Sequence, residues 1–232
     1  MFTVGPVQEN CYIVSASGQA GAQAGGLRPA VIVDPGEEPE RLLEAAQALG
    51  VRLEAILLTH CHFDHIGAVA PVARATGAPV WCPEIEVPVL ADINRFVPFA
   101  GFGPFEDYDA DETVAGGERL QLAGMDIEVL HTPGHSPGHV TYAIEEEGAL
   151  FSGDVLFQGS VGRVDLPGGD WATLERSIGG LLRGFPAQTV VYPGHMGVTP
   201  LGRERDANPF LTELRERVPR ATAAPDATAA ER

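Results

Sequence analysis

Residues 59–67 read THCHFDHIG and contain three histidines, His60, His62 and His65. The other four histidines of the 232-residue chain lie in two further short motifs, HTPGHSPGH at 131–139 and YPGHMG at 192–197. Histidines used for packing or solvation would be spread along the chain. Imidazoles gathered in Gly- and Pro-rich turns beside acidic residues instead provide neutral nitrogen donors. This confinement predicts a metal site.

Strand and helix patterns alternate on both sides of the first motif. Short apolar runs predict buried strands, and apolar residues at helical spacing predict helices. The strand patterns are 30–34, 53–59 and 79–82, and the helix patterns are 41–49, 67–76 and 84–95. Residues 96–109 are rich in Phe, Gly and Pro without a period, which indicates a loop able to flank a pocket. This β-α-β rhythm is typical of an α/β fold.

The second half of the chain begins with strand patterns separated by Gly-containing turns, which predicts a second sheet. These strands are expected at 112–122, 125–132, 140–154 and 189–192, and helices at 171–182 and 203–217. Asp170 is the expected N-cap of the helix at 171–182. Residues 17–27 indicate a hairpin tip, and 218–232 have nothing to bury, which predicts a disordered tail after one domain at 1–217.

The first motif can present donors to two metal ions. Side chains two apart in an extended segment point the same way, so His60 and His62 can face one ion while Cys61 points elsewhere. Asp64 and His65 begin the next element and can face a second ion. Paired ions in hydrolytic sites lie about 3.5–4 Å apart, a gap that one carboxylate can bridge. Asp154, which follows an apolar strand in LFSGDVLF, is the candidate bridge.

Taken in order, the motifs of this chain resemble those of the metallo-β-lactamase superfamily and, within it, of the glyoxalase II-like hydrolases. The resemblance covers residues 10 to about 211 and rests on THCHFDH, TPGHSPGH, SGD before an apolar pair, GSVGRVDLPGGD, PGH and ERDANPFL. It implies an α/β fold, the four-layer αββα sandwich, with the site at one edge of the two sheets. It also implies the metal ligands: His60, His62 and His135 on one ion, Asp64, His65 and His195 on the other, and Asp154 between them.

The remaining polar residues of these motifs are expected to have structural roles. His131 and His139 occupy spare positions in the second motif and are expected to support the ligands or the turn. Thr59 is expected to hold the loop through its hydroxyl, and Cys61 to be a packed thiol. Two divalent ions are the expected cofactors, with zinc favoured and with iron or manganese also compatible with imidazole and carboxylate donors.

Two metals would lower the pKa of a shared water and stabilise an oxyanion, which is chemistry for acyl transfer to water. A thiol leaves as an anion, whereas an amide nitrogen must first be protonated, and no free acid stands out beside the motifs. A small-molecule thioester is therefore the expected substrate, S-lactoylglutathione-like by the resemblance. Asp64 is expected to orient the attacking hydroxide in addition to binding its ion. Arg163, with Arg203 and Arg205, is available to meet a carboxylate of the thiol.

A second hypothesis comes from another reaction class. Persulfide dioxygenases share the first motif, the TPGH turn, the SGD and a GRxD segment like residues 162–165, but use one iron. The corresponding ligands here are His60, His135 and Asp154, a facial triad that leaves positions open for oxygen. The segment from PGHMG to ERDANPFL is closer to short bacterial glyoxalase II-like proteins, which favours the hydrolase.

The composition of the chain argues against some classes of binding partner and some cellular locations. A formal net charge of −17 without a basic cluster repels phosphate backbones, which argues against nucleic acid. The N-terminal residues lack the layout of a secretory signal and no long apolar run exists, so neither export nor a membrane span is predicted. Three cysteines far apart in sequence indicate free thiols in a reducing compartment, and a cytoplasmic location is expected.

Overall fold

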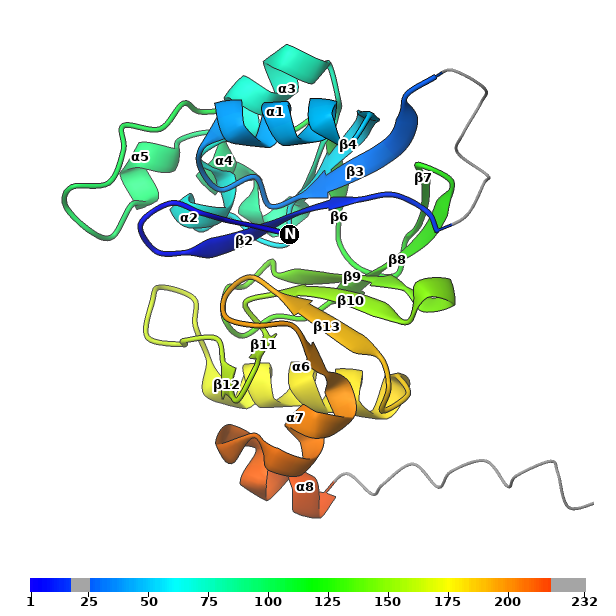
Figure 1. Cartoon of the computed structure of the whole chain (residues 1–232). Coiled ribbons are helices and arrows are strands. Elements are labelled where there is room, and N and C mark those ends of the chain that lie inside the picture. Colours follow the sequence, from blue (N-terminus) through cyan, green and yellow to red (C-terminus); the bar gives the residue numbers. More distant parts are fainter. Residues whose placement is uncertain (18–25, 218–232) are drawn as a thin grey trace, which may run out of the picture.

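The computed structural model describes residues 1–17 and 26–217. Two six-stranded sheets face each other, and helices cover the outer face of each (Figure 1). This confirms the four-layer αββα architecture. The predicted tail and most of the predicted hairpin tip lie outside the described residues.

The first sheet contains the N-terminal strands in sequence order. They are β1 (Phe2–Val4), β2 (Glu9–Val14), β3 (Arg28–Val33), β4 (Val51–Leu57), β5 (Val80–Pro83) and β6 (Glu112–Val114). The pairs β1–β2 and β2–β3 are antiparallel, whereas β3 to β6 run parallel. Helices α1 (Pro39–Ala48) and α3 (Val69–Thr76) provide crossovers and cover the outer face (Figure 1). This half therefore has the predicted β-α-β character.

The second sheet is mostly antiparallel. In spatial order its strands are β14 (Thr199–Pro200), β13 (Val190–Pro193), β10 (Ala149–Gly153), β9 (Val140–Ile144), β8 (Met125–His131) and β7 (Arg119–Leu122). The pair β10–β13 alone in this sheet is parallel among the described residues, and helix α6 (Trp171–Gly184) lies beneath the sheet (Figure 1). A separate hairpin joins β11 (Leu156–Phe157) to β12 (Ser160–Val161). The predicted second sheet is thus present.

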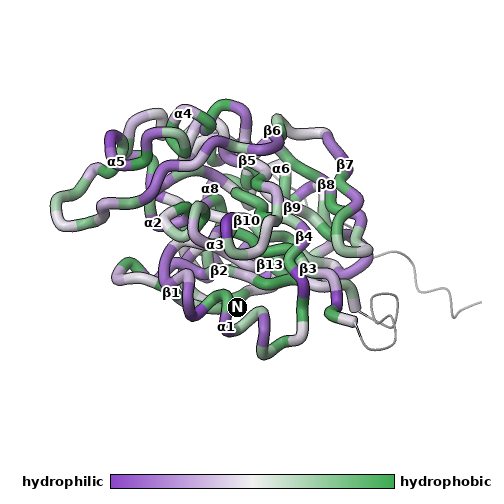
Figure 2. Tube along the Cα trace, turned by 90° about the horizontal axis from the view of Figure 1, so that it is seen from above, coloured by the Kyte–Doolittle hydropathy of each residue, from purple (hydrophilic) through white to green (hydrophobic). Residues whose placement is uncertain are grey.

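Alternating side chains of the strands build three apolar layers. In β3, Ala30 and Ile32 belong to the cluster under α1 and α3, whereas Val31 and Val33 belong to the cluster between the sheets. The third cluster joins the outer face of the second sheet to α6. In Figure 2 the strands inside the molecule are mostly hydrophobic, whereas hydrophilic residues are more frequent in the segments around them. Strands buried on both faces, such as β3 and β10, therefore read as apolar runs, whereas β8 alternates buried with partly exposed residues.

The helix predicted at 84–95 is instead three short pieces. A 3-10 turn at Glu84–Glu86 leads into α4 (Val87–Leu90), and α5 (Ile93–Phe96) follows after Asp92. Asp92 has φ −154° and ψ 60°, which is not helical, so the chain bends between the last two. The loop predicted at 96–109 is present from residue 97 onward, whereas Phe96 is the last residue of α5.

The helix predicted at 203–217 is also divided. α7 (Leu201–Ala207) ends at Asn208, a 3-10 turn at Pro209–Leu211 follows, and α8 (Thr212–Arg217) completes the segment. The residue before a proline is disfavoured in the helical region, which explains the break at Asn208. By contrast, α6 begins as predicted, because the Asp170 side chain accepts a hydrogen bond of 2.8 Å from the Thr173 backbone N–H. None of the described helices is long and apolar enough to cross a membrane.

Candidate metal centre

The first histidine motif lies where β4 ends and the four-residue helix α2 (Phe63–Ile66) begins. His62 immediately precedes α2 and is extended, so His60 and His62 point to the same side. His60 Nε2 lies 3.2 Å from His62 Nδ1, which lies 2.8 Å from His135 Nε2. These three residues form the first triad, in which three imidazole nitrogens from two distant segments converge.

A second group of donors lies beside the first. Asp64, His65 and His195 form the second triad, whose candidate ligand atoms lie within 4.8 Å of one another. His195 Nε2 is 3.3 Å from Asp64 Oδ2, and His65 Nε2 is 3.9 Å from the same oxygen. His195 comes from the turn after β13, so the second triad joins the two sheets.

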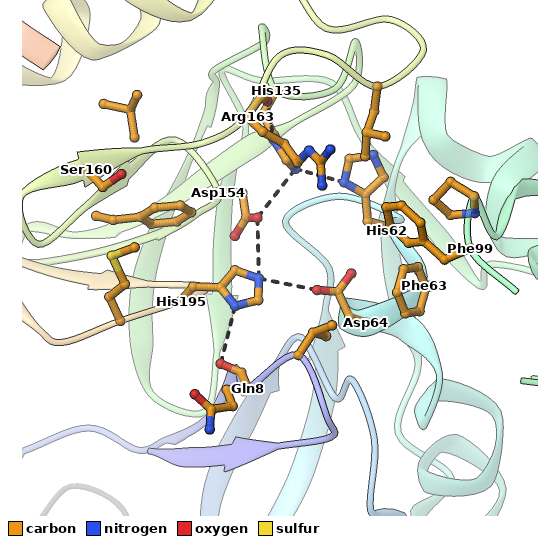
Figure 3. A pocket seen from close by; sticks show the side chains of 16 residues that line it. Gln8, His62, Phe63, Asp64, Phe99, His135, Asp154, Ser160, Arg163 and His195 are labelled. Carbon is orange, nitrogen blue, oxygen red and sulfur yellow. Dashed lines mark hydrogen bonds and ion pairs between the residues drawn. The ribbon is translucent and has the colours of Figure 1, made fainter. Parts of the chain in front are cut away.

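Asp154 lies between the two triads. Its Oδ2 is 3.5 Å from His135 Nε2 and 3.5 Å from His195 Nε2, while its Oδ1 is 3.4 Å from His65 Nε2. Figure 3 shows His135, His195 and Asp64 arranged around this carboxylate. The structure therefore brings together all seven residues expected as ligands from the sequence.

Hydrogen bonds on the outer side of the rings determine which imidazole nitrogen faces the cluster. His65 Nδ1 donates to Asp34 Oδ2 at 3.1 Å, and His135 Nδ1 donates to the Arg163 carbonyl at 2.8 Å. His195 Nδ1 donates to the Gln8 carbonyl at 3.3 Å. With Nδ1 protonated in each ring, the lone pair of Nε2 points toward the other donors. This is the arrangement that metal-binding histidines adopt.

Asp34 is a buried residue whose role the sequence did not reveal. Its Oδ1 accepts the Thr59 backbone N–H at 2.7 Å, and its Oδ2 accepts the Thr59 hydroxyl at 2.6 Å. The Thr59 oxygen in turn lies 3.0 Å from His60 Nδ1, so it accepts from that ring. The expected loop-supporting role of Thr59 is thus confirmed. The signal for Asp34 was its position after a buried strand, the same signal that identified Asp154.

The two spare histidines of the second motif have different positions. His139 is buried, accepts the Asp154 backbone N–H through Nε2 at 3.1 Å and contacts Thr132 Oγ1 through Nδ1 at 3.1 Å. His131 is exposed and bonds the Pro137 carbonyl at 3.2 Å. His139 therefore holds the backbone of the candidate bridge, and His131 holds the turn. Cys61 points into the core, with its Sγ 3.5 Å from Cys82 Sγ.

Burial and neighbouring charges shift the pKa values of the histidines in opposite directions. Burial is the main cause that lowers the pKa of His60 well below its usual value and that of His62 to about 3, with neighbouring imidazoles adding to it. Burial also opposes charge on His65 and His195, but the carboxylates of Asp154 and Asp64 outweigh it and raise both pKa values. His60 and His62 are therefore neutral, whereas positive charge is favoured at His65 and His195.

A cavity of about 500 Å³ opens onto both triads. Apolar side chains form much of its wall, including Phe63, Phe99 and Met196. Arg163 lies at its rim near His135 (Figure 3), where it forms a bidentate ion pair with Asp165 at 2.7 and 2.8 Å. The Arg163 guanidinium carbon is also 5.8 Å from the centroid of the Phe99 ring. A small molecule in this cavity would meet the metal-site residues at its floor and mainly apolar groups on the walls.

The donor set fits a pair of divalent metal ions. His65 Nε2 and Asp154 Oδ1 are buried and have no hydrogen-bond partner among the described residues. Five imidazoles and two carboxylates facing one another would be unfavourable without positive charge between them. Imidazole with carboxylate suits zinc, iron and manganese.

The family model of the metallo-beta-lactamase superfamily matches residues 4–195. The chain therefore belongs to the metallo-beta-lactamase superfamily. Together with the donor clusters, this defines a metal-dependent hydrolase of that superfamily.

Three similar proteins extend the comparison. Hydroxyacylglutathione hydrolase GloC of Haemophilus influenzae is 37% identical over 195 residues, which cover 78% of this chain and 87% of GloC. The solved structure of BLEG-1 B3 metallo-beta-lactamase is 40% identical, with a TM-score of 0.82 and coverage of 90% of this chain and 97% of that one. TTHA1623, solved in a di-iron-bound form, is 42% identical, with a TM-score of 0.78 and coverage of 90% and 98%.

Proposed function

We propose that this chain is a dinuclear thioesterase of the glyoxalase II type, which hydrolyses an S-acyl thioester to a carboxylic acid and a free thiol. In this proposal the first triad would hold one ion, the second triad would hold the other, and Asp154 would be shared between them. Zinc is the favoured metal. The di-iron form of TTHA1623 supports iron as an alternative for the same donor types.

The metal pair would supply a hydroxide at neutral pH and a positive site for the oxyanion. The chain's own residues would orient the reactants. Asp64 is the more exposed of the two site carboxylates, with 13% of its side chain accessible against 9% for Asp154. It is therefore the carboxylate best placed to accept a hydrogen bond from the attacking group, whereas Asp154 is held from behind by His139.

The observation that carries the thioester assignment is the composition of the cavity wall. No tyrosine is found among the described residues that line it, and the chain has no lysine. An amine leaving group needs a proton from a general acid, whereas a thiol, with a pKa of about 8.5, leaves as an anion. A site with apolar walls and histidines committed to metals thus favours thioesters. The name of GloC, hydroxyacylglutathione hydrolase, supports the same class.

Arg163 is proposed to contact the thiol portion of the substrate. Its guanidinium lies at the rim of the cavity and already carries a bidentate bond to Asp165. A substrate carboxylate would share or replace that bond. Because the chain carries a net charge of −17, long-range attraction of anionic thiols is absent and this local contact would account for their binding.

The test combines metal analysis with thiol release. Protein purified without added metal is analysed for its elements and assayed on thioesters that share a thiol but differ in the acyl group. Two ions per chain and thiol release are expected, and Asp154→Ala should abolish both. Asp126→Ala, which removes a partly exposed carboxylate on β8, is the matched control and should leave both unchanged. Intact thioesters in the presence of two bound ions would reject the reaction class.

Two alternatives give different results in the same assay. β-Lactam hydrolysis is favoured by the name of the BLEG-1 structure, and ring opening of a penicillin without thioester cleavage would select it. The persulfide dioxygenase hypothesis requires one iron on His60, His135 and Asp154. Because those enzymes share the first motif, the ligand residues alone do not separate the two reactions, and the number of bound ions does. One iron per chain with oxygen uptake on glutathione persulfide would select it instead.

A further inference from the structure

Glu9 in β2 is a buried acid whose carboxylate lacks hydrogen-bond partners. Its side chain is fully inaccessible to solvent, and neither oxygen has a partner among the residues that the structure describes. Glu204 is equally buried, but its carboxylate accepts hydrogen bonds from Gly159, Thr199 and Asn208. A buried carboxylate is expected to be paired. Glu9 therefore requires an explanation that Glu204 does not.

The position of Glu9 relates it to the second triad. Its Oε1 lies 3.8 Å from His65 Nδ1, the nitrogen that donates to Asp34 at 3.1 Å. Nε2 of the same ring is 3.4 Å from Asp154 Oδ1. The imidazole of His65 thus lies between two carboxylates on its outer side and the metal-site carboxylates on its inner side.

Glycine at position 36 permits this close approach. A Cβ built on Gly36 would lie 2.7 Å from Glu9 Oε2 and would overlap the backbone oxygen of Asp64. Glu9 is therefore packed next to the segment that carries Asp64 and His65, with only the glycine backbone between. This packing leaves the carboxylate desolvated and close to the cluster.

The charges around Glu9 are mostly of its own sign. Burial is the main cause that raises the pKa of Glu9 well above its usual value, and the carboxylates of Asp34, Asp64 and Asp154 raise it further, while His65 lowers it. In the absence of cations, this arrangement is electrostatically unfavourable. With two divalent ions in place, the four carboxylates would balance four positive charges.

We propose that Glu9 is a positioning residue of the metal centre, which strengthens binding of the ion held by Asp64, His65 and His195. The inference rests on the proposed dinuclear site. Glu9 adds negative charge next to Nδ1 of His65. This charge makes Nε2 of the same ring a stronger ligand for a metal ion. It has no comparable role in holding the fold, because its carboxylate bonds no other described group.

The test is Glu9→Gln, which keeps the shape and removes the charge. Metal-free protein is titrated with Zn²⁺ against a chromogenic chelator, and melting is followed with and without Zn²⁺. We expect the second ion to bind about 10- to 100-fold more weakly, the usual effect of losing a group behind a ligand. The first ion should bind within about twofold of wild type. The metal-free variant should melt at the wild-type temperature or above it, because the carboxylate of Glu9 makes no hydrogen bond that the substitution could remove.

Three further variants define the outcome. His195→Ala removes a donor to the second ion and provides the reference for its loss. Glu204→Gln is the matched buried glutamate and should lower the melting temperature with and without Zn²⁺, without changing the second affinity. Glu9→Asp keeps the charge and should retain part of the affinity, which also covers the case that Glu9→Gln folds poorly.

The results separate this inference from the proposed function. If wild type binds fewer than two ions, the dinuclear proposal fails. If wild type binds two and Glu9→Gln binds the second equally well, the inference alone is wrong. The inference is also wrong if Glu9→Gln lowers the melting temperature equally in the metal-free and metal-loaded forms. An equal decrease is what loss of a purely structural residue would cause.

Discussion

Asp34 and His139 are single residues that hold the candidate ligands from behind. Asp34 connects Thr59 to His65 through both carboxylate oxygens, and His139 accepts the backbone N–H of Asp154. Neither contacts the cavity. A ligand is useful only if its ring or carboxylate is oriented, and these bonds provide that orientation.

His139→Gln should make the metal-free protein less sensitive to acid. Burial, with the charge of His135, lowers the pKa of His139 well below its unfolded value of about 6.5. The neutral imidazole of His139 therefore contributes its full stabilisation above pH ~6.5. This stabilisation is lost as the pH falls toward the pKa of His139 in the folded protein. Wild type should lose up to about 1.4 kcal/mol per pH unit from this group. The slope of urea-unfolding free energy between pH 6 and 5 should be shallower in the variant, and parallel slopes would contradict the assignment.

Arg163→Met should raise KM for thioesters of anionic thiols by about tenfold, an effect of roughly 1.4 kcal/mol. Thioesters of neutral thiols should be unaffected. The His135 ring should keep its position, because it bonds the backbone carbonyl of residue 163. Asp165→Asn should have the opposite effect on KM. It weakens the ion pair that holds the Arg163 guanidinium, so KM for thioesters of anionic thiols should fall. Steady-state kinetics on paired substrates measure both, and equal changes for neutral thiols would exclude a charge contact.

At the scale of elements, strand ends and their turns bring the donors together. His60 and His62 follow β4, Asp154 follows β10 and His195 follows β13. β10 and β13 are parallel neighbours, so their ends meet at one edge. The turns there require glycine. A Cβ on Gly194 would overlap Asp154 Oδ1 and lie 2.6 Å from His65 Cε1.

Gly194→Ala should therefore displace Asp154 and reduce bound metal, although Gly194 offers no ligand atom. Elemental analysis should find fewer than two ions per chain. Gly180→Ala is the matched control, because it lies within α6 and its Cβ would meet nothing within 4 Å. The control should bind metal normally and gain about 0.5–1 kcal/mol of stability from higher helix propensity. Normal metal content in Gly194→Ala would show that the turn has more room than its geometry indicates.

Asp170→Ala should lower the free energy of unfolding by about 1 kcal/mol, because α6 would lose its N-cap. The Asp170 carboxylate accepts from the Thr173 backbone N–H and, at 2.6 Å, from its hydroxyl. Asp170→Asn keeps an acceptor at the same position and should cost only a small part of this. Urea unfolding at neutral pH provides the comparison. Equal losses in both variants would indicate that charge, rather than capping, is responsible.

At the scale of the whole molecule, the candidate metal centre joins the two halves. The first sheet leads into His60, His62, Asp64 and His65, and the second half provides His135, Asp154 and His195. Between the sheets, Tyr12, Val31, Tyr142 and Phe151 belong to one shared apolar cluster. Bound ions would add a polar connection at the edge of that cluster. Their removal should therefore affect the entire fold rather than a loop.

Chelation should lower the melting temperature of the protein by at least ~10 °C. An ion at 1,000 times its Kd stabilises by about 4 kcal/mol, and a domain of this size loses about 2–4 °C per kcal/mol. Calorimetry before and after dialysis against a chelator measures the change. Zn²⁺, but not Mg²⁺, should restore it, because the donors are mostly imidazole. An unchanged melting temperature after complete metal removal would show that the ions do not connect the halves.

The sequence by itself pointed to the seven residues that the structure brings together, and it predicted the order of most strands and helices. His60, His62 and Asp64 are close in sequence, and local spacing orients them whatever the rest of the chain does. Strands such as β3 and β4 were predictable because both faces are buried. The breaks at Asp92 and Asn208 were missed because helical spacing continues across them, although Pro209 signalled the second.

Only the tertiary structure decided which groups stand behind the donors. Glu9 and Asp34 are separated from His65 by long stretches of chain, and β2, which carries Glu9, gave no clear strand pattern because polar Glu9 and Asn10 are buried in it. Their contact with the cluster depends on the pairing of β2 with β3 and on the glycine at position 36. Hydrogen bonds and burial act through space over a few ångströms, so sequence spacing carries no record of them until the sheets are assembled.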